Sequence, residues 1–177
     1  TGVSLGEATA GVLVSAEAKN AKIKVLGDSS IKDENHISGP SRTGEGLFLS
    51  IQNALKEAQI DAEKLDYISA HGTATPFNDE MEAIAFGRLN LQNVPVNSLK
   101  GFYGHTLGAS GLLETVIAIE SANQNILFES KGFDEIGVSE TINVIEKNKE
   151  ANIDFFLKTA SGFGGCNTAV VFEKIKH

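Results

Sequence analysis

The chain has 177 residues and a formal net charge of −8, and 41% of its residues are hydrophobic while 21% are charged. That length suffices for one domain with a sizeable core, and the composition is typical of a globular protein. The acidic balance argues against a nucleic-acid-binding surface, and no apolar run approaches the roughly 18 residues of a membrane span.

The N-terminus and the cysteine count bear on localisation. The first residues offer neither the basic nor the apolar region of a signal peptide. The single cysteine, Cys166, allows no internal disulfide, which fits a reducing compartment. We therefore expect a cytoplasmic protein. The chain does not begin with Met, which suggests a processed chain or an excised fragment.

The first third of the chain predicts two strands, a long loop and a helix. Residues 10–16 and 23–27 are mainly apolar runs on either side of a turn, which predicts strands. Residues 28–46 show no clear periodicity and predict a loop of a length that is often functional. A helix with one buried stripe follows, because apolar residues recur at helical spacing: Leu47, Ile51, Ala54, Leu55 and Ala58.

Strands and helices alternate in the middle of the chain. Residues 65–70 and 94–99 predict short strands, and the first of them ends at His71. Residues 108–123 predict a helix that is apolar nearly all round and therefore well buried. Between the two strands, helical spacing of Met81, Ile84, Ala85 and Leu89 predicts another helix.

A pair of acidic residues stands at the expected start of that second helix. Glu82 follows Asp79 at a spacing of three, which is the spacing of a capping box. We therefore expect Asp79 to cap this helix.

Three strand-like runs close the chain, at residues 141–145, 154–160 and 168–172. The alternation in the middle predicts a largely parallel sheet covered by helices, while the tight glycine turn at 161–167 predicts an antiparallel pair. No linker divides residues 1–177. We expect an α/β fold with layers in the order α/β/α and a mixed five-stranded sheet.

Two histidines follow predicted strands and precede predicted helices. His71 is followed by Gly72 and two threonines, and His105 lies in a Gly-His-Thr turn. Ligands of open α/β sheets bind beyond the carboxyl ends of strands, so two imidazoles there can aim two N–H donors at one oxyanion. The alternative is that each histidine merely caps the end of a strand or helix.

Two charged residues flank the second histidine. Lys100 precedes His105 by five residues, and Glu114 lies within an otherwise apolar helical segment. A carboxylate in such surroundings needs a partner, and Lys100 is the nearest candidate. The alternative is a pair of solvated surface charges.

The glycine-rich turn near the C-terminus holds an aromatic residue and the cysteine. Phe163 between glycines is either a movable gate or part of a simple hairpin turn. Cys166 precedes a predicted strand rather than a helix, so we expect a small buried cysteine and not a nucleophile. His36, His71, His105 and Cys166 lack a short ligand spacing, so no metal site is expected.

These motifs together resemble the C-terminal half of a β-ketoacyl-acyl carrier protein synthase, a condensing enzyme of the thiolase-like fold. The resemblance runs nearly from end to end, beginning with Leu5-Gly6-Glu7. In chain order the matching motifs are residues 33–40 (D-x-x-H-x-T-x-P, with Ser38 in place of threonine), 71–79 (H-G-T-x-T-x-x-N-D), 100–111 (K-x-x-x-G-H-x-x-G-A-x-G), Glu114, and 162–167 (G-F-G-G-x-N).

The resemblance implies a decarboxylative Claisen condensation in fatty acid or polyketide biosynthesis. A cysteine of the N-terminal domain, absent here, would carry the acyl group, and residues 1–177 would be the C-terminal domain. His71 and His105 would stabilise the malonyl enolate, with Lys100 and Glu114 holding His105. The remaining implied residues are Thr73, Thr75 and Ser38 on the phosphopantetheine arm, Phe163 as gate, and Asp79, Glu82, Gly162, Gly164, Gly165 and Asn167 as structural neighbours of the site.

The resemblance also implies partners. These are acyl carrier protein, the N-terminal domain, and a second subunit in a homodimer or in a heterodimer with a partner synthase. No cofactor is expected, because the substrates travel on the carrier protein's phosphopantetheine. This chain by itself is expected to be inactive, since it lacks the nucleophile.

The chain departs from the family pattern at one place. Thr159-Ala160-Ser161 stands where the family usually has N-S-F, which leaves the substrate open. Two alternatives also remain, a non-catalytic partner subunit of the chain-length-factor type and a thiolase that acts on coenzyme A esters. The retention of both histidines argues against the former, and the type of histidine motif argues against the latter.

Overall fold

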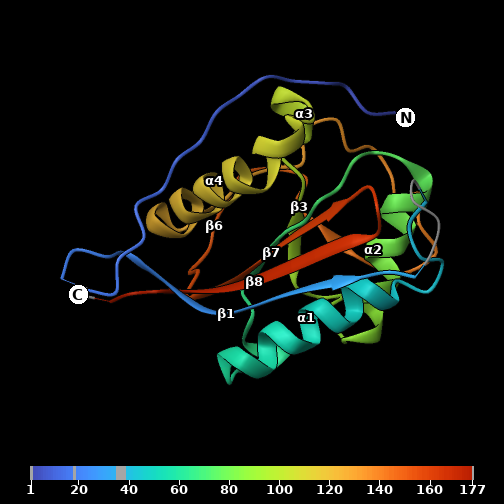
Figure 1. Ribbon diagram of the computed structural model, residues 1–177. Helices are drawn as coiled ribbons and strands as arrows, with labels where there is room; N and C mark the ends of the chain where they lie inside the picture. Colours follow the sequence, from blue (N-terminus) through green and yellow to red (C-terminus); the bar gives the residue numbers. More distant parts are fainter. Residues whose placement is uncertain (1, 18, 35–38, 177) are drawn as a thin grey trace.

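The computed structural model describes residues 2–17, 19–34 and 39–176, and it shows a mixed sheet with helices on both faces (Figure 1). The sheet has six strands in the order β1-β8-β7-β2-β3-β5, where five were expected. All six strands overlap strand-like runs predicted from the sequence, and β5, which falls in the run at 141–145, has only two residues and lies at one edge. The bounds of the sheet's strands are Ile23–Lys32 (β1), Tyr67–Ser69 (β2), Pro95–Asn97 (β3), Asn143–Val144 (β5), Phe155–Gly162 (β7) and Cys166–Lys174 (β8).

Strand direction divides the sheet into two parts. β2 runs parallel to β3 and β7, and β3 runs parallel to β5. β8 pairs antiparallel with both β7 and β1. The expected parallel centre and the antiparallel final pair are both present. A separate two-stranded pair, β4 (Ile126–Leu127) with β6 (Lys149–Glu150), was not anticipated.

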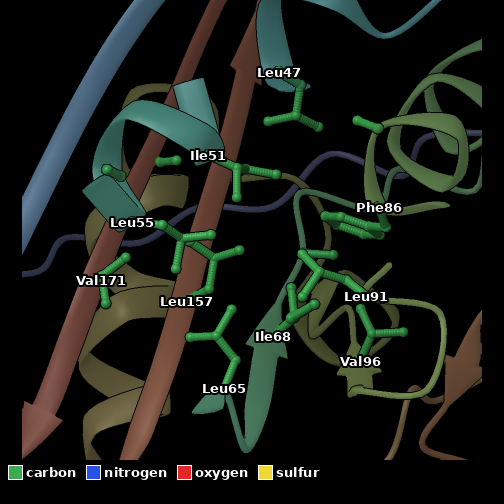
Figure 2. Packing of buried hydrophobic residues seen from close by; sticks show 14 of the residues in the cluster. Leu47, Ile51, Leu55, Leu65, Ile68, Phe86, Leu91, Val96, Leu157 and Val171 are labelled. Atoms are coloured by element: carbon green, nitrogen blue, oxygen red, sulfur yellow. The ribbon is translucent and has the colours of Figure 1, made fainter. Parts of the chain in front are cut away.

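Two helices cover one face of the sheet and one long helix covers the other (Figure 1). The helices are α1 (Glu45–Ala58), α2 (Pro76–Arg88), the short α3 (Lys100–Tyr103) and α4 (Ser110–Gln124). α1 and α2 pack on the sheet through the larger hydrophobic cluster, part of which Figure 2 shows. The α4 helix packs on the opposite face through a smaller cluster.

Strand periodicity explains why the sheet feeds two cores. Ile68 and Leu157 enter the α1 and α2 cluster, whereas Tyr67 and Phe156, each one residue earlier, enter the α4 cluster. Successive side chains of a strand point to opposite faces, so a central strand buried on both faces is continuously apolar. β2 and β7 are therefore interior strands of an α/β/α sandwich.

The N-terminal part of the chain differs from the prediction. Residues 10–16 form no strand, and Leu13 is 96% exposed. The run has apolar residues of strand type, but among the described residues no strand pairs with it. Conversely, β1 continues to Lys32, through the start of the expected loop, because β8 pairs with it along its length.

The α4 helix is not buried all round as expected. Its buried residues are Ser110, Glu114, Ala118, Ser121 and Ala122, which are small or polar, while Leu112 is 37% exposed. Small residues let the helix approach the sheet closely, and Glu114 has ionic partners there. Most of its larger apolar residues are only half-buried.

The expected capping box of α2 is also wrong. Thr75 is the N-cap residue and makes no side-chain capping bond, and Pro76 opens the first turn. Asp79 and Glu82 instead accept hydrogen bonds from the loop that precedes the helix. Their spacing is that of a capping box, but the N–H groups they satisfy belong to another segment.

Ile51 lies in the hydrophobic core, fully buried between α1 and the sheet (Figure 2). Replacing Ile51 with Ala in the protein that carries this chain is expected to lower the free energy of unfolding by about 2–5 kcal/mol, because the cavity does not fully collapse. Ile136 serves as the control, because it is 47% exposed. Ile136→Ala should change the free energy of unfolding by less than about 0.5 kcal/mol. Urea denaturation compares the two variants, and equal losses would contradict the assignment of the core.

Candidate active site

The two histidines lie side by side at the carboxyl edge of the sheet. The ring centroids of His71 and His105 are 5.2 Å apart, and the ring planes meet at 77°. His71 is 6% exposed, and His105 is half-buried. Two turns that are 34 positions apart in the sequence meet because β2 and β3 are parallel neighbours whose carboxyl ends share an edge.

The N-terminal segment holds both histidine loops, a feature that the sequence did not indicate. Leu5 forms a parallel bridge with His105. The His105 N–H donates to the Ser4 carbonyl at 2.7 Å, and the Gly6 N–H donates to the His105 carbonyl at 3.1 Å. The Gly2 N–H donates to the Ala74 carbonyl in the other loop. The segment that begins the chain is therefore part of the site.

The backbone of the His71 turn is fixed by a buried carboxylate. Glu82 accepts from the N–H of His71 at 2.9 Å and from the N–H of Gly72 at 2.6 Å. Gly72 has a φ of +39°, and a Cβ atom there would lie 2.5 Å from the Cβ of Ser98. A side chain is excluded, so the glycine of this motif has a steric reason.

Hydrogen bonds set the tautomers of both rings. The Lys100 ammonium lies 3.5 Å from Nδ1 of His71, and because an ammonium can only donate, Nδ1 is the acceptor. The Leu107 N–H donates to Nδ1 of His105 at 3.1 Å, so that Nδ1 is also an acceptor. Each neutral ring therefore carries its proton on Nε2.

The electrostatic surroundings keep both imidazoles neutral. Burial lowers the pKa of His71 to about 2, and the charges of Lys100 and Lys158 act in the same direction. Burial likewise lowers the pKa of His105, with a further contribution from Lys100. Two neutral imidazoles next to each other can each donate an Nε2–H hydrogen bond to an oxyanion without a change in their protonation state.

The expected Lys100–Glu114 pair exists, but it holds a different histidine from the one expected. The Nζ of Lys100 lies 2.6 Å from Oε1 of Glu114, and both side chains are nearly inaccessible to solvent. The same ammonium donates to the backbone carbonyl of His71. Lys100 therefore supports His71 directly, and among the hydrogen bonds of the described residues it makes none to His105.

Sequence reasoning missed a second lysine at this site. The Nζ of Lys158, on β7, lies 2.5 Å from Oε2 of Glu114, and Lys158 is 3% exposed. Burial alone would raise the pKa of the Glu114 carboxyl, but the charges of Lys158 and Lys100 outweigh it and hold that pKa below its usual value. The available signal was a lysine within an apolar run that forms an interior strand.

The other expected site residues have mixed placements. The hydroxyls of Thr73 and Thr75 lie 2.7 Å apart beside His71, and the Asp79 carboxylate accepts from the Thr73 N–H. Phe163 is 88% exposed at the tip of the β7–β8 hairpin. Ser38 and His36 lie outside the described residues. Cys166 is exposed, not buried as expected.

The hairpin that carries Phe163 is tied to the loop after β1. The Asn167 side chain donates to Asp33 at 3.0 Å and accepts from the Ser161 hydroxyl at 2.8 Å. Gly164 and Gly165 have φ values of +87° and +79°, which favour glycine. Ser161 stands where the family that the sequence resembles usually has an aromatic residue. Its hydroxyl links the two strands of the hairpin through Asn167.

Within residues 2–17, 19–34 and 39–176, no group of three or more His, Cys, Asp or Glu side chains is placed to hold a metal ion. In the same part of the chain, none of the helices is long and apolar enough to cross a membrane.

This arrangement defines an α/β protein with a paired-imidazole site, and comparisons with known proteins name its family. The family model "Beta-ketoacyl synthase, C-terminal domain" matches residues 23–134. The chain therefore belongs to the β-ketoacyl synthase family and matches its C-terminal domain.

Curated relatives and solved structures agree with this family. The chain is 32% identical to 3-oxoacyl-[acyl-carrier-protein] synthase 2 of Coxiella burnetii, with 98% of this chain and 44% of the relative covered. It is 34% identical to the chloroplastic synthase II of Arabidopsis thaliana, with 99% and 34% covered. The chain thus spans less than half of the length of these relatives.

Among solved structures, a β-ketoacyl synthase from Burkholderia phymatum superposes with a TM-score of 0.82 and 28% identity, covering 88% of this chain and 38% of that one. A ketosynthase of Xenorhabdus doucetiae in complex with its chain length factor also gives 0.82 and 28%, covering 89% and 40%. The fold is the thiolase-like ketosynthase fold.

The neutral state of His71 predicts a loss of stability in acid. The folded pKa is depressed to about 2, so the contribution of this group is complete above the unfolded pKa of about 6.5 and is lost as the pH falls below it. Between about pH 7 and about pH 5 the loss from this group is about 2 kcal/mol. The Tm of the protein should fall as the pH is lowered over that range. The Tm of the His71→Gln variant should fall less, because glutamine does not titrate. Parallel Tm profiles would contradict the buried neutral imidazole.

Proposed function

We propose that this chain is the C-terminal half of a β-ketoacyl-acyl carrier protein synthase that catalyses decarboxylative condensation in fatty acid or polyketide biosynthesis. The observation that carries the proposal is the pair of imidazole rings, whose centroids lie 5.2 Å apart and whose Nδ1 atoms each face a hydrogen-bond donor, which leaves both Nε2–H groups for an oxyanion. Family membership and the curated relatives, which are 3-oxoacyl-acyl carrier protein synthases, support it.

The chemistry assigned to the imidazoles is enolate stabilisation. In malonyl-acyl carrier protein the bond to the carboxylate breaks, carbon dioxide leaves, and the electron pair moves into the thioester to form an enolate. His71 and His105 donate their Nε2–H groups to the enolate oxygen, which carries the developing charge. The enolate carbon then attacks an acyl thioester on a cysteine of the preceding half, and that cysteine leaves as thiolate.

The proposed partners follow from the same reaction. The substrates are held on the phosphopantetheine of acyl carrier protein, with Thr73, Thr75 and Ser38 as contacts, Phe163 as a gate and no cofactor. A related solved structure is a type II polyketide synthase acyl carrier protein with its ketosynthase, and another holds a ketosynthase with its chain length factor. We propose a homodimer or such a heterodimer for the full-length protein, in the cytoplasm.

The N-terminal half is proposed to cover the apolar side of α4. This helix turns small and polar residues to its own sheet, and Leu112 is 37% exposed. The extended segment before β1 also exposes Leu13 and Val14. Apolar surface exposed in this way favours further apolar contacts, so we expect the isolated chain to self-associate or to be marginally stable.

Removing either imidazole separates decarboxylation from acyl transfer. In the full-length protein, His71→Ala or His105→Ala should lower malonyl decarboxylation roughly 100-fold or more, since each removes one oxyanion donor. Acylation of the cysteine should persist, because it uses no enolate. Release of carbon dioxide and transfer of a radiolabelled acyl group measure the two steps, with the exposed substitution Gln124→Ala as control.

Undiminished decarboxylation in either histidine variant would refute the assignment. Absence of decarboxylation in the wild-type full-length protein would favour the non-catalytic partner subunit instead.

Cys166 is predicted not to be the nucleophile. It opens β8 and is exposed, and its sulfur lies 3.7 Å from the Ser30 hydroxyl, a group that does not act as a base. Cys166→Ser in the full-length protein should keep most of the condensing activity. An epoxide inhibitor of condensing enzymes should label a cysteine outside this chain, as read by mass spectrometry. A covalent label on Cys166 would overturn this mechanism.

A further inference from the structure

The central strand β7 holds a buried lysine, Lys158, to which the proposed chemistry assigns no role. Lys158 pairs in register with Ser69 of β2 and stands between buried apolar and polar neighbours. Burying an ammonium is unfavourable unless it is fully paired, so a lysine here requires specific partners.

The contacts of this ammonium account for all of its hydrogen-bonding capacity. The Nζ of Lys158 donates to Oε2 of Glu114 at 2.5 Å, to the Ser69 carbonyl at 3.2 Å and to the Ala70 carbonyl at 3.1 Å. An ammonium has three N–H bonds, so each has an acceptor. Two of the three acceptors are the backbone carbonyls directly before His71.

Lys100 binds the next carbonyl along the same stretch of backbone. Its ammonium donates to the His71 carbonyl and to the other oxygen of Glu114. Two lysines bridged by one carboxylate thus bind three consecutive carbonyls, those of residues 69 to 71. From the other side, Glu82 accepts from the N–H groups of His71 and Gly72. The backbone that carries His71 is held on both its carbonyl and its N–H side.

We propose that Lys158 is a positioning residue for His71, acting through the carbonyls of residues 69 and 70 and through Glu114. This inference rests on the proposed function for its catalytic consequence only. Without Lys158, the two carbonyls and one oxygen of Glu114 lose a donor in a buried site, and the strand end before His71 loses its anchor. Displacement of the His71 ring then weakens one of the two enolate contacts.

The charges around Lys158 agree with this role. The groups that face it are Glu114 on α4, Glu82 on α2, Lys100 on α3 and the His71 ring at the end of β2. Its positive charge disfavours an imidazolium at His71 and so supports the neutral donor. The network as a whole balances two lysines against two carboxylates.

The test compares two lysines in the full-length protein. Lys174 is the matched control, because its ammonium also donates to a backbone carbonyl, that of Ala122 at 2.7 Å, but at the opposite end of α4 from Glu114. K158M and K174M each remove an ammonium at nearly constant length. K158R keeps the charge and the donors.

The readouts are the kinetics of malonyl-acyl carrier protein decarboxylation and the nitrogen-15 NMR signals of the His71 ring. In K158M we expect kcat to fall at least about tenfold with KM nearly unchanged, because the loss lies in the transition state. The His71 nitrogen signals should shift or broaden in K158M. K158R should recover part of kcat, and K174M should leave kcat and the His71 signals unaltered.

Distinct outcomes separate the two proposals. Wild-type kcat and unaltered His71 signals in a folded K158M would overturn the positioning role, even if its Tm falls. If the wild-type protein does not decarboxylate the substrate, the proposed function fails, while the His71 signals still decide the positioning role. If K158M does not fold, K158Q, which keeps an amide donor without charge, is read by the same criteria.

Discussion

The site depends on one buried ionic arrangement, a carboxylate held between two ammonium groups. Glu114 is 1% exposed, and its two oxygens lie 2.6 and 2.5 Å from the nitrogens of Lys100 and Lys158. Such a group is unfavourable if any member is removed, because the remaining charges are left buried without a partner. The arrangement joins α4, α3 and β7 behind the His71 turn, so the position of the imidazole depends on all three elements.

The parallel part of the sheet provides the frame for this arrangement. β2 ends at the His71 turn, β3 leads into the His105 turn, and β7 brings Lys158 up beside β2. Hydrogen-bonded neighbours in a sheet keep a fixed spacing, so the groups that they carry are placed without relying on loop conformation. The backbone of residues 2–6 then forms hydrogen bonds with both histidine turns and so links them.

Much of this site could be predicted from the sequence, because its signals are local. A glycine after His71 and a helix after each turn indicate ligand-binding βα loops, and the parallel order follows from the alternation of strands and helices. The proximity of His71 to His105 and the pairing of Lys100 with Glu114 then follow from topology. The stripe of α1 is equally local, and the structure buries Leu47, Ile51, Ala54 and Leu55 as expected.

What the sequence alone determined is therefore the order of the longer helices and of the strands in the main sheet, and the residues that gather at one edge of that sheet. Only the tertiary structure decided which groups meet there: that Glu82 serves the His71 turn and not its own helix, that Lys158 completes the ion network, and that residues 10–16 form no strand. The reason is physical. Spacing along the chain specifies local geometry, whereas the partner of a buried charge or of an unpaired backbone group is set by contacts between segments far apart in sequence.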